Sequence, residues 1–146
     1  MAACGFAPAY GPEGGAGALR GRIAVQTPAT RDDFEFVSRL ESRLGRAEAP
    51  AYDLTYVLSS TRGSGGITAT NVTTRYTLKG TATWTLTDRA TGTRVAGGAV
   101  QNFTSWSATG TTVAGLAAED DASRRLSVML ADQVITRLVA AAASLK

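Results

Sequence analysis

The segment 72–87 constrains the fold more than any other part of this 146-residue chain. Every odd position holds threonine, arginine or lysine, and the even positions are mostly apolar, interrupted by Thr74 and Gly80. The apolar members are Val72, Tyr76, Leu78, Ala82, Trp84 and Leu86. Alternation with a period of two predicts a β-strand with one buried and one polar face. Asp88-Arg89-Ala90-Thr91-Gly92 is typical of a turn, so residues 93–107 are expected to return as the second strand of a long hairpin.

The return strand is less regular, because Phe103 and Trp106 fall on opposite parities. Gly97-Gly98 therefore indicates a bulge that switches the two faces. A strand of about 16 residues spans roughly 53 Å, whereas a domain of this length is about 40 Å across. The hairpin is expected to bend or to project beyond the body, and projection would expose Arg89 and Arg94 near its tip.

Three shorter elements precede the hairpin. Alternating residues from Leu19 to Val25 predict a short strand, and residues 52–58 predict another. Between them, Thr30 with Asp33 forms a variant of the capping box, and Gly45 suits a helix C-terminus. The helix is expected to bury Phe36 or Val37, Leu40 and Leu44.

Residues 63–66, Gly-Ser-Gly-Gly, predict a loop. They match a phosphate-binding loop in composition alone, because no Lys-Ser/Thr pair or helix start follows them. Nucleotide binding at this loop is therefore not expected.

A C-terminal helix is predicted from Thr112 to about Ser144. Leu126, Leu130, Val134 and Leu138 recur every four residues and predict its buried face. The acidic triplet 119–121 is interpreted as charge near the positive end of the helix. Without a positioned partner it does not suggest a catalytic carboxylate pair.

The N-terminus carries the chain's single cysteine. Met1-Ala2-Ala3-Cys4-Gly5 matches the downstream half of a bacterial lipobox, which predicts a signal peptide upstream and diacylation of Cys4. A buried or incidental cysteine is the alternative. Residues 7–18 are rich in glycine and proline and predict a flexible tether. We therefore expect an anchor and tether over 1–18 and one folded domain over 19–146.

Composition argues against an enzyme. The chain has no histidine, so a Ser-His-Asp or Cys-His arrangement is excluded and the commonest metal ligand is missing. Neither a catalytic residue, a metal site nor a cofactor is predicted.

The net charge is +3. The excess lies in residues 72–112, where four cations face only Asp88; they are Arg75, Lys79, Arg89 and Arg94. This asymmetry favours an anionic partner, with a solvated basic face as the alternative.

In order along the chain, these features resemble the LPS-assembly lipoprotein family (LptE, or rare lipoprotein B), and in particular its alphaproteobacterial type. The residues that carry the resemblance are Cys4-Gly5-Phe6, Thr73-Thr74-Arg75-Tyr76-Thr77-Leu78, Phe103-Thr104-Ser105-Trp106-Ser107-Ala108, Leu116-Ala117-Ala118-Glu119-Asp120-Asp121-Ala122 and 130–138. The resemblance implies an α+β fold, a two-layer sandwich in which two helices pack on one face of a four-stranded sheet.

The resemblance also implies a function. It predicts an outer-membrane lipoprotein facing the periplasm, which plugs the LptD barrel in a one-to-one complex, assists its assembly and helps deliver lipopolysaccharide (LPS) to the cell surface. Arg75, Lys79, Arg89 and Arg94 are the candidate LPS contacts, because arginine and lysine bind phosphates. The alternative is a lipid-anchored envelope module for another anionic glycan or protein. Nucleic-acid binding is not expected, because aromatic residues do not interleave with the basic ones.

Overall fold

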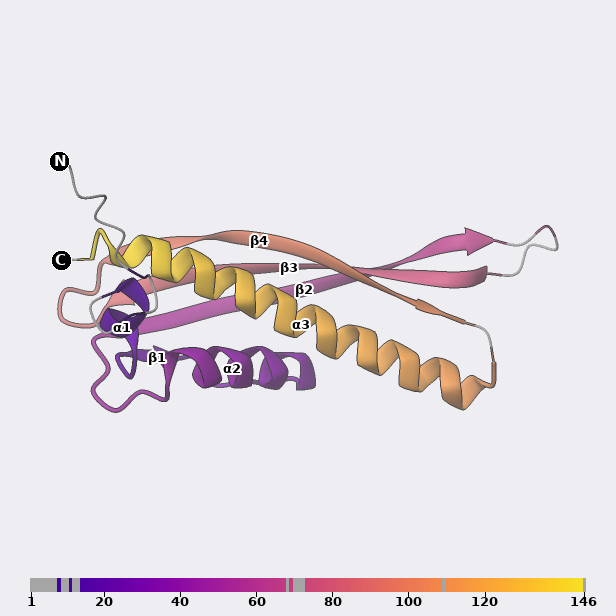
Figure 1. Cartoon of the computed structure of the whole chain (residues 1–146), viewed down its shortest axis with the longest axis horizontal. Helices are drawn as coiled ribbons and strands as arrows, with labels where there is room; N and C mark the ends of the chain where they lie inside the picture. Colours follow the sequence, from indigo (N-terminus) through magenta and orange to yellow (C-terminus); the bar gives the residue numbers. More distant parts are fainter. Residues whose placement is uncertain are drawn as a thin grey trace.

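The computed structural model describes residues 8, 11, 14–67, 69, 73–108 and 110–145. Its elements, in chain order, are α1 (Gly15–Leu19), β1 (Ile23–Val25), α2 (Arg31–Leu44), β2 (Tyr52–Ile67), β3 (Thr73–Asp88), β4 (Arg94–Ser107) and α3 (Thr112–Ala142) (Figure 1). The strands form one four-stranded sheet in the order β1-β2-β3-β4. β1 runs parallel to β2, and the longer strands pair antiparallel.

The predicted α+β sandwich is confirmed, with the helices on one face of the sheet. Figure 1 shows α3 running obliquely along the sheet with α2 beside it. The buried apolar side chains of the sheet are Ile23, Tyr52, Leu54, Tyr56, Leu78, Ala82, Trp84, Leu86, Val100 and Trp106. Those of α2 and α3 include Phe36, Val37, Leu40, Leu44, Leu126, Leu130, Val134, Ile135 and Leu138. One core therefore fills the space between the two layers.

The alternating segment behaves as predicted. Leu78, Ala82, Trp84 and Leu86 are buried against the helices, while Arg75 and Lys79 are exposed on the opposite face. We call this helix-free face of β2, β3 and β4 the outer face. Along β3 it is polar, because the odd-numbered residues of this strand point to it.

The helix α2 is bounded by the predicted signals. The Thr30 side chain accepts a hydrogen bond from the Asp33 N–H, and the Asp33 carboxylate accepts one from the Thr30 N–H, which completes a capping box. Gly45 follows the helix with φ +76°, a conformation that favours glycine. Arg39 of α2 donates two hydrogen bonds to Asp132 of α3, at 2.8 and 3.0 Å, and so joins the helices.

The loop predicted at residues 63–66 is wrong. Gly63 and Ser64 pair with Thr77 and Tyr76, and Gly66 pairs with Arg75 after a register shift at Gly65. Pairing with the regular strand β3 thus overrides the low strand preference of glycine, and Gly65 is absorbed as a bulge.

The bulge predicted at Gly97-Gly98 is also wrong. These residues continue the ladder opposite Thr85 and Trp84, and the register shift lies at Val95 instead. No switch of faces follows. Trp106 is 7% exposed and faces the core, whereas Phe103 is 63% exposed because it lies on the outer face.

The boundary of the predicted tether needs correction as well. Residues 15–18 belong to the predicted tether, but they form most of α1, which ends in the buried Leu19. A Cβ on Gly15 would lie 2.6 Å from the Val139 carbonyl oxygen, so only glycine fits against α3 at this point. The folded part therefore includes Gly15.

The β3–β4 turn does not project from the body. It lies beside α1 and the C-terminal end of α3 (Figure 1). The Arg89 N–H donates to the Ala51 carbonyl at 3.0 Å. The opposite end of the sheet, where β2 leads to β3, extends past α2 instead. Among the described helices, none combines the length and apolarity needed to cross a bilayer.

Candidate functional site

The predicted lipidation residue, Cys4, lies outside the described residues. Its acylation therefore stays a prediction. The other predicted site residues, Arg75, Lys79, Arg89 and Arg94, are all described and exposed.

The structure does not bring these four cations together. Arg75 and Lys79 share the outer face of β3, opposite Ser107 and Phe103 of β4. Arg94 pairs with Thr87, eight residues further along β3 than Lys79, which corresponds to roughly 26 Å. The set therefore divides into a pair at the projecting end of the sheet and a pair at the turn.

Arg89 is engaged within the chain. Its Nε donates to both carboxylate oxygens of Asp53, at 2.9 and 3.0 Å, which fastens the turn to the start of β2. Arg94 lies over Gly97, where a Cβ would collide with the guanidinium. The turn pair is therefore less suited to bind an external anion than its position at a hairpin tip suggested.

Lys79 lies beside an exposed aromatic ring on the outer face. It pairs across the strands with Phe103 on one side and Thr61 on the other. These three residues, with Ser59, Thr81 and Gln101, line a shallow hollow of about 660 Å³. A cation, hydroxyl and amide groups and an apolar ring thus occur together, which suits a ligand that is anionic, rich in sugar hydroxyls and partly apolar.

Sequence reasoning missed Arg62. Its Nη1 contacts both carboxylate oxygens of Glu119 at 3.0 Å, and its guanidinium lies 4.2 Å from the Tyr76 ring centroid and 5.5 Å from that of Trp106. Tyr76 and Trp106 are themselves stacked with centroids 5.4 Å apart. Through its ion pair and these cation–π contacts, Arg62 therefore ties three strands to the start of α3. Arg62 has an even number, as do the buried Leu54 and Tyr56, so the alternation of the strand could have indicated that it faces the helices. The loop predicted at 63–66 interrupted that alternation.

The acidic triplet 119–121 is not charge for the first helical turn, which holds no acidic residue. Each member pairs with arginine: Glu119 with Arg62, Asp120 with Arg31, and Asp121 with Arg124 and Arg125. Hydrogen bonds from Arg124 and then Arg125 lower the pKa of Asp121 below its ordinary value. The triplet is thus a set of structural ion pairs.

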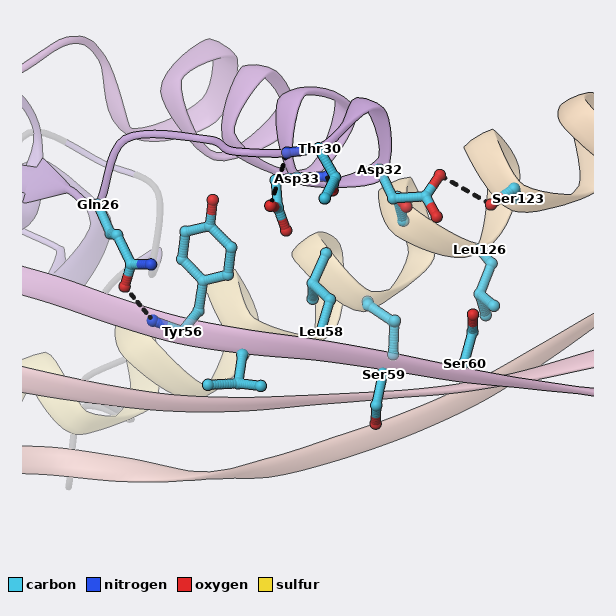
Figure 2. A pocket seen from close by; sticks show the side chains of 13 residues that line it. Gln26, Thr30, Asp32, Asp33, Tyr56, Leu58, Ser59, Ser60, Ser123 and Leu126 are labelled. Carbon is cyan, nitrogen blue, oxygen red and sulfur yellow. Dashed lines mark hydrogen bonds between the residues drawn. The ribbon is translucent and has the colours of Figure 1, made fainter.

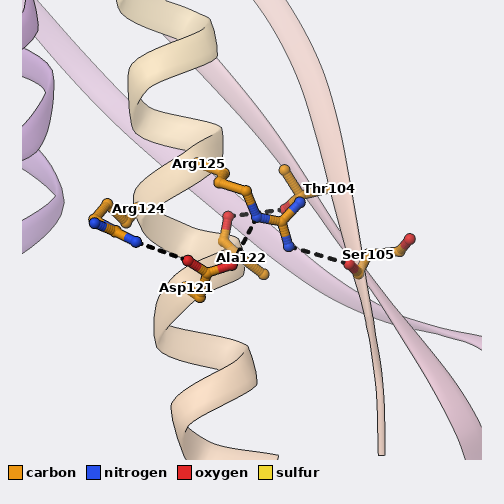
Figure 3. A network of polar contacts seen from close by, with 6 residues as sticks. All are labelled: Thr104, Ser105, Asp121, Ala122, Arg124 and Arg125. Atoms are coloured by element: carbon orange, nitrogen blue, oxygen red, sulfur yellow. Dashed lines mark hydrogen bonds and ion pairs between the residues drawn. The ribbon is translucent and has the colours of Figure 1, made fainter.

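Figure 3 shows how α3 is joined to β4 beside Asp121. The buried Thr104 donates from its hydroxyl to the Ala122 carbonyl at 3.0 Å, and Arg125 reaches the Ser105 carbonyl at 3.4 Å. Since Thr104 is held by this bond, its polarity does not indicate a ligand site.

A second hollow, of about 420 Å³, lies between the start of α2, β2 and α3 (Figure 2). Asp32 accepts a hydrogen bond from Ser123 at 2.8 Å, and Asp33 caps α2. Tyr56 is 5% exposed, and its hydroxyl has no hydrogen-bond partner among the described residues. Burial, and to a lesser extent the charge of Asp33, raises the pKa of Tyr56 to about 12. Across the described ranges, no three acidic or cysteine side chains converge as metal ligands.

The sequence model of the LptE family, described as lipopolysaccharide-assembly, matches residues 21–138. Solved structures share the fold. A protein from Caulobacter crescentus CB15 is 23% identical, with a TM-score of 0.74 over 91% of this chain and 98% of its own. Rare lipoprotein B from Shewanella oneidensis is 12% identical, with a TM-score of 0.66 over 85% of this chain and 96% of its own. A minor lipoprotein from Acinetobacter baumannii is 19% identical, with a TM-score of 0.64 over 84% and 92%. Comparison with curated proteins gives no match.

Proposed function

We propose that this chain, which belongs to the LptE lipopolysaccharide-assembly family, acts as the lipoprotein subunit of the LPS export translocon in the outer membrane. In this role it plugs the LptD barrel, assists the assembly of that barrel and helps deliver LPS to the cell surface. The single observation that carries the proposal is the family match over residues 21–138, which spans every strand and most of α3.

The outer face supports contact with LPS. Lipid A presents phosphates, sugar hydroxyls and acyl chains, and the projecting end of this face offers Arg75 and Lys79 together with exposed Phe103. Arginine binds phosphate through paired N–H donors, and lysine acts as a point charge. Arg75 and Lys79 are therefore the preferred LPS contacts within the original set of four, and Arg89 and Arg94 are secondary.

The same face suits the lumen of a large barrel. Barrel interiors are polar, and the threonines of β3 offer hydroxyl groups along much of its length. Diacylation of Cys4 would hold the domain at the periplasmic side of the membrane, because two acyl chains suffice for stable anchoring. The family's role in assembly, and the lack of histidine, favour a non-enzymatic protein.

The second candidate function is an anchored module for another anionic glycan or protein. The same cations and hydroxyls on the outer face favour it, since they are not selective for lipid A by themselves. This alternative predicts binding to anionic polysaccharide without a barrel partner.

One experiment separates the two functions. The precursor, with its signal peptide and a C-terminal tag, is expressed in its own bacterium and purified from detergent-solubilised envelopes. The proposal expects a stoichiometric large β-barrel, identified as LptD by mass spectrometry, and LPS in the same complex. Recovery without a barrel, while an anionic glycan free of lipid A is retained, would support the alternative and reject the translocon function.

A further inference from the structure

The sheet has a long open edge along β2. β1 pairs only with Tyr52, Asp53 and Leu54, although β2 continues to Ile67. In the described part of the chain no strand lies on this side of β2 beyond Leu54. Most proteins protect such an edge because unpaired backbone groups can bind another strand.

On this side of β2, the backbone pairing with β1 ends at Gln26, whose side chain forms the last hydrogen bond. The Gln26 N–H donates to the Leu54 carbonyl at 2.9 Å. Gln26 Oε1 accepts from the Tyr56 N–H at 3.3 Å (Figure 2). Backbone groups of a strand alternate in direction, so those of Leu58, Ser60 and Arg62 point to the same side as those of Leu54 and Tyr56. We call residues 56–62 of this side the β2 edge.

Space is available beside the β2 edge. Residues 56–60 form one wall of the 420 Å³ hollow, and the start of α2 and one side of α3 form the others (Figure 2). A strand added next to β2 would direct alternate side chains into this hollow, beside Tyr56 and Ser60. The hollow would then determine which side chain is accepted.

The chemistry of the hollow favours a cation. Asp32 and Asp33 line it, and among the described residues that line it there is no lysine or arginine. The nearly buried Tyr56 adds a phenolic oxygen without a hydrogen-bond partner among the described residues. An ammonium or guanidinium group donates hydrogen bonds only, and is therefore attracted to a hollow lined by two carboxylates.

From these observations we infer that the β2 edge binds an extended segment of a partner protein as an additional strand, with a lysine or arginine of that segment in the hollow beside Asp32, Asp33 and Tyr56. Backbone hydrogen bonds to Leu58, Ser60 and Arg62 supply affinity, and the hollow supplies selectivity, as in other cases of strand addition. This site lies on an edge and not on the outer face. The inference does not depend on the proposed function, because its test involves neither LPS nor a barrel.

The test uses the chain in solution with acetylated heptapeptides of alternating threonine and valine, whose central residue is lysine, glutamate or norleucine. We expect the lysine peptide to bind at least about tenfold more tightly than the glutamate peptide. Its binding should slow hydrogen exchange at the amides of Leu58, Ser60 and Arg62, measured by NMR. Equal affinity for lysine and glutamate, or no protection of these amides at saturating lysine peptide, would overturn the inference.

Two pairs of variants locate the site. Ser60→Pro removes an outward N–H from the β2 edge, and Gln101→Pro does the same on the free edge of β4, where neither substitution removes a ladder bond. Only Ser60→Pro should abolish binding. Asp32→Asn should weaken the lysine peptide about five- to tenfold and leave the norleucine peptide unchanged, whereas Glu48→Gln, an exposed substitution with the same change in charge, should alter neither. The assignment would be refuted if Gln101→Pro lost binding while Ser60→Pro retained it, or if Asp32→Asn had no effect. The Asp32→Asn result decides the question if Ser60→Pro folds poorly.

Discussion

Leu126 of α3 lies directly over Gly80 of β3. A Cβ on Gly80 would be 2.8 Å from Leu126 Cδ2 and 3.1 Å from Leu130 Cδ1. The glycine that interrupts the apolar pattern of β3 is therefore the position at which the long helix approaches the sheet. Its lack of a side chain sets the distance between the two layers.

Gly80→Ala should consequently destabilise the domain. Overpacking of a filled core costs about 1–3 kcal/mol, and this cost exceeds the roughly 0.5–1 kcal/mol that alanine gains over glycine within a strand. Gly63→Ala is the matched control, because among the described residues no atom outside its chain neighbours lies within 4 Å of the position of its Cβ. Guanidinium unfolding followed by circular dichroism compares the two. Equal stability of Gly80→Ala and wild type would contradict this, because it would mean that α3 shifts away from β3 at little energetic cost.

The helical stripe predicts a second stability difference. Leu130 is 3% exposed, and Leu130→Ala should cost about 2–5 kcal/mol because it leaves a cavity between α3 and the sheet. Leu116→Ala on the same helix should change stability by less than about 0.5 kcal/mol, since Leu116 is 61% exposed. Chemical denaturation measures both. A similar loss in the two variants would mean that the first turns of α3 are packed in solution.

Several local patterns in the sequence determine structure on their own. The alternation of residues 72–87, despite Thr74 and Gly80, and the Thr30–Asp33 capping box were sufficient to predict β3 and α2, because both signals are local in the sequence. The strand at residues 63–66 could not be predicted in this way. Its glycines have low strand preference, and they are extended because β3 pairs with them.

The site was harder to predict than the fold. Charge counting identified four cations, yet it could not show that Arg89 is paired with Asp53 on β2, which lies 36 residues away. Nor could it show that Arg62 pairs with Glu119, 57 residues along the chain. The sequence shows where charged residues lie along the chain, whereas their ion-pair partners depend on tertiary contacts.

Tyr56 should make stability depend on pH in the alkaline range. Its folded pKa of about 12 lies above the ordinary tyrosine value of about 10, so the folded state retains a proton that the unfolded state loses. The contribution is fully present below about pH 10 and is lost as the pH rises towards 12, with a total of roughly 2–3 kcal/mol at 1.36 kcal/mol per pKa unit. Tyr56→Phe lacks this dependence. Urea unfolding of both proteins at pH 8 and pH 11 measures it, and parallel losses would contradict the raised pKa.

Cys4 tests the predicted anchor. In the natural precursor, Cys4→Ala should abolish labelling with a radioactive fatty acid and release the protein from membranes, because the thiol is the acylation site in a lipobox. Cys4→Ala in the soluble chain should leave the unfolding midpoint unchanged. A marked loss of stability in the soluble variant would show that Cys4 has a structural role instead of an anchoring one.

The outer face provides the most direct test of LPS binding. Arg75→Glu with Lys79→Glu reverses both cations of the projecting end and should weaken binding of purified LPS at least about tenfold, because phosphate contacts of arginine and lysine are replaced by repulsion. Added salt should weaken wild-type binding in the same direction, since the contacts are exposed and screened.

Arg89→Glu with Arg94→Glu carries the same change in charge at the opposite end of the hairpin and is the matched control. It should reduce binding less, because Arg89 is already paired with Asp53. Circular dichroism confirms that each variant is folded. If the turn pair weakens LPS binding more than Arg75 and Lys79 do, LPS is bound at the turn end of the sheet and the preferred contacts are Arg89 and Arg94.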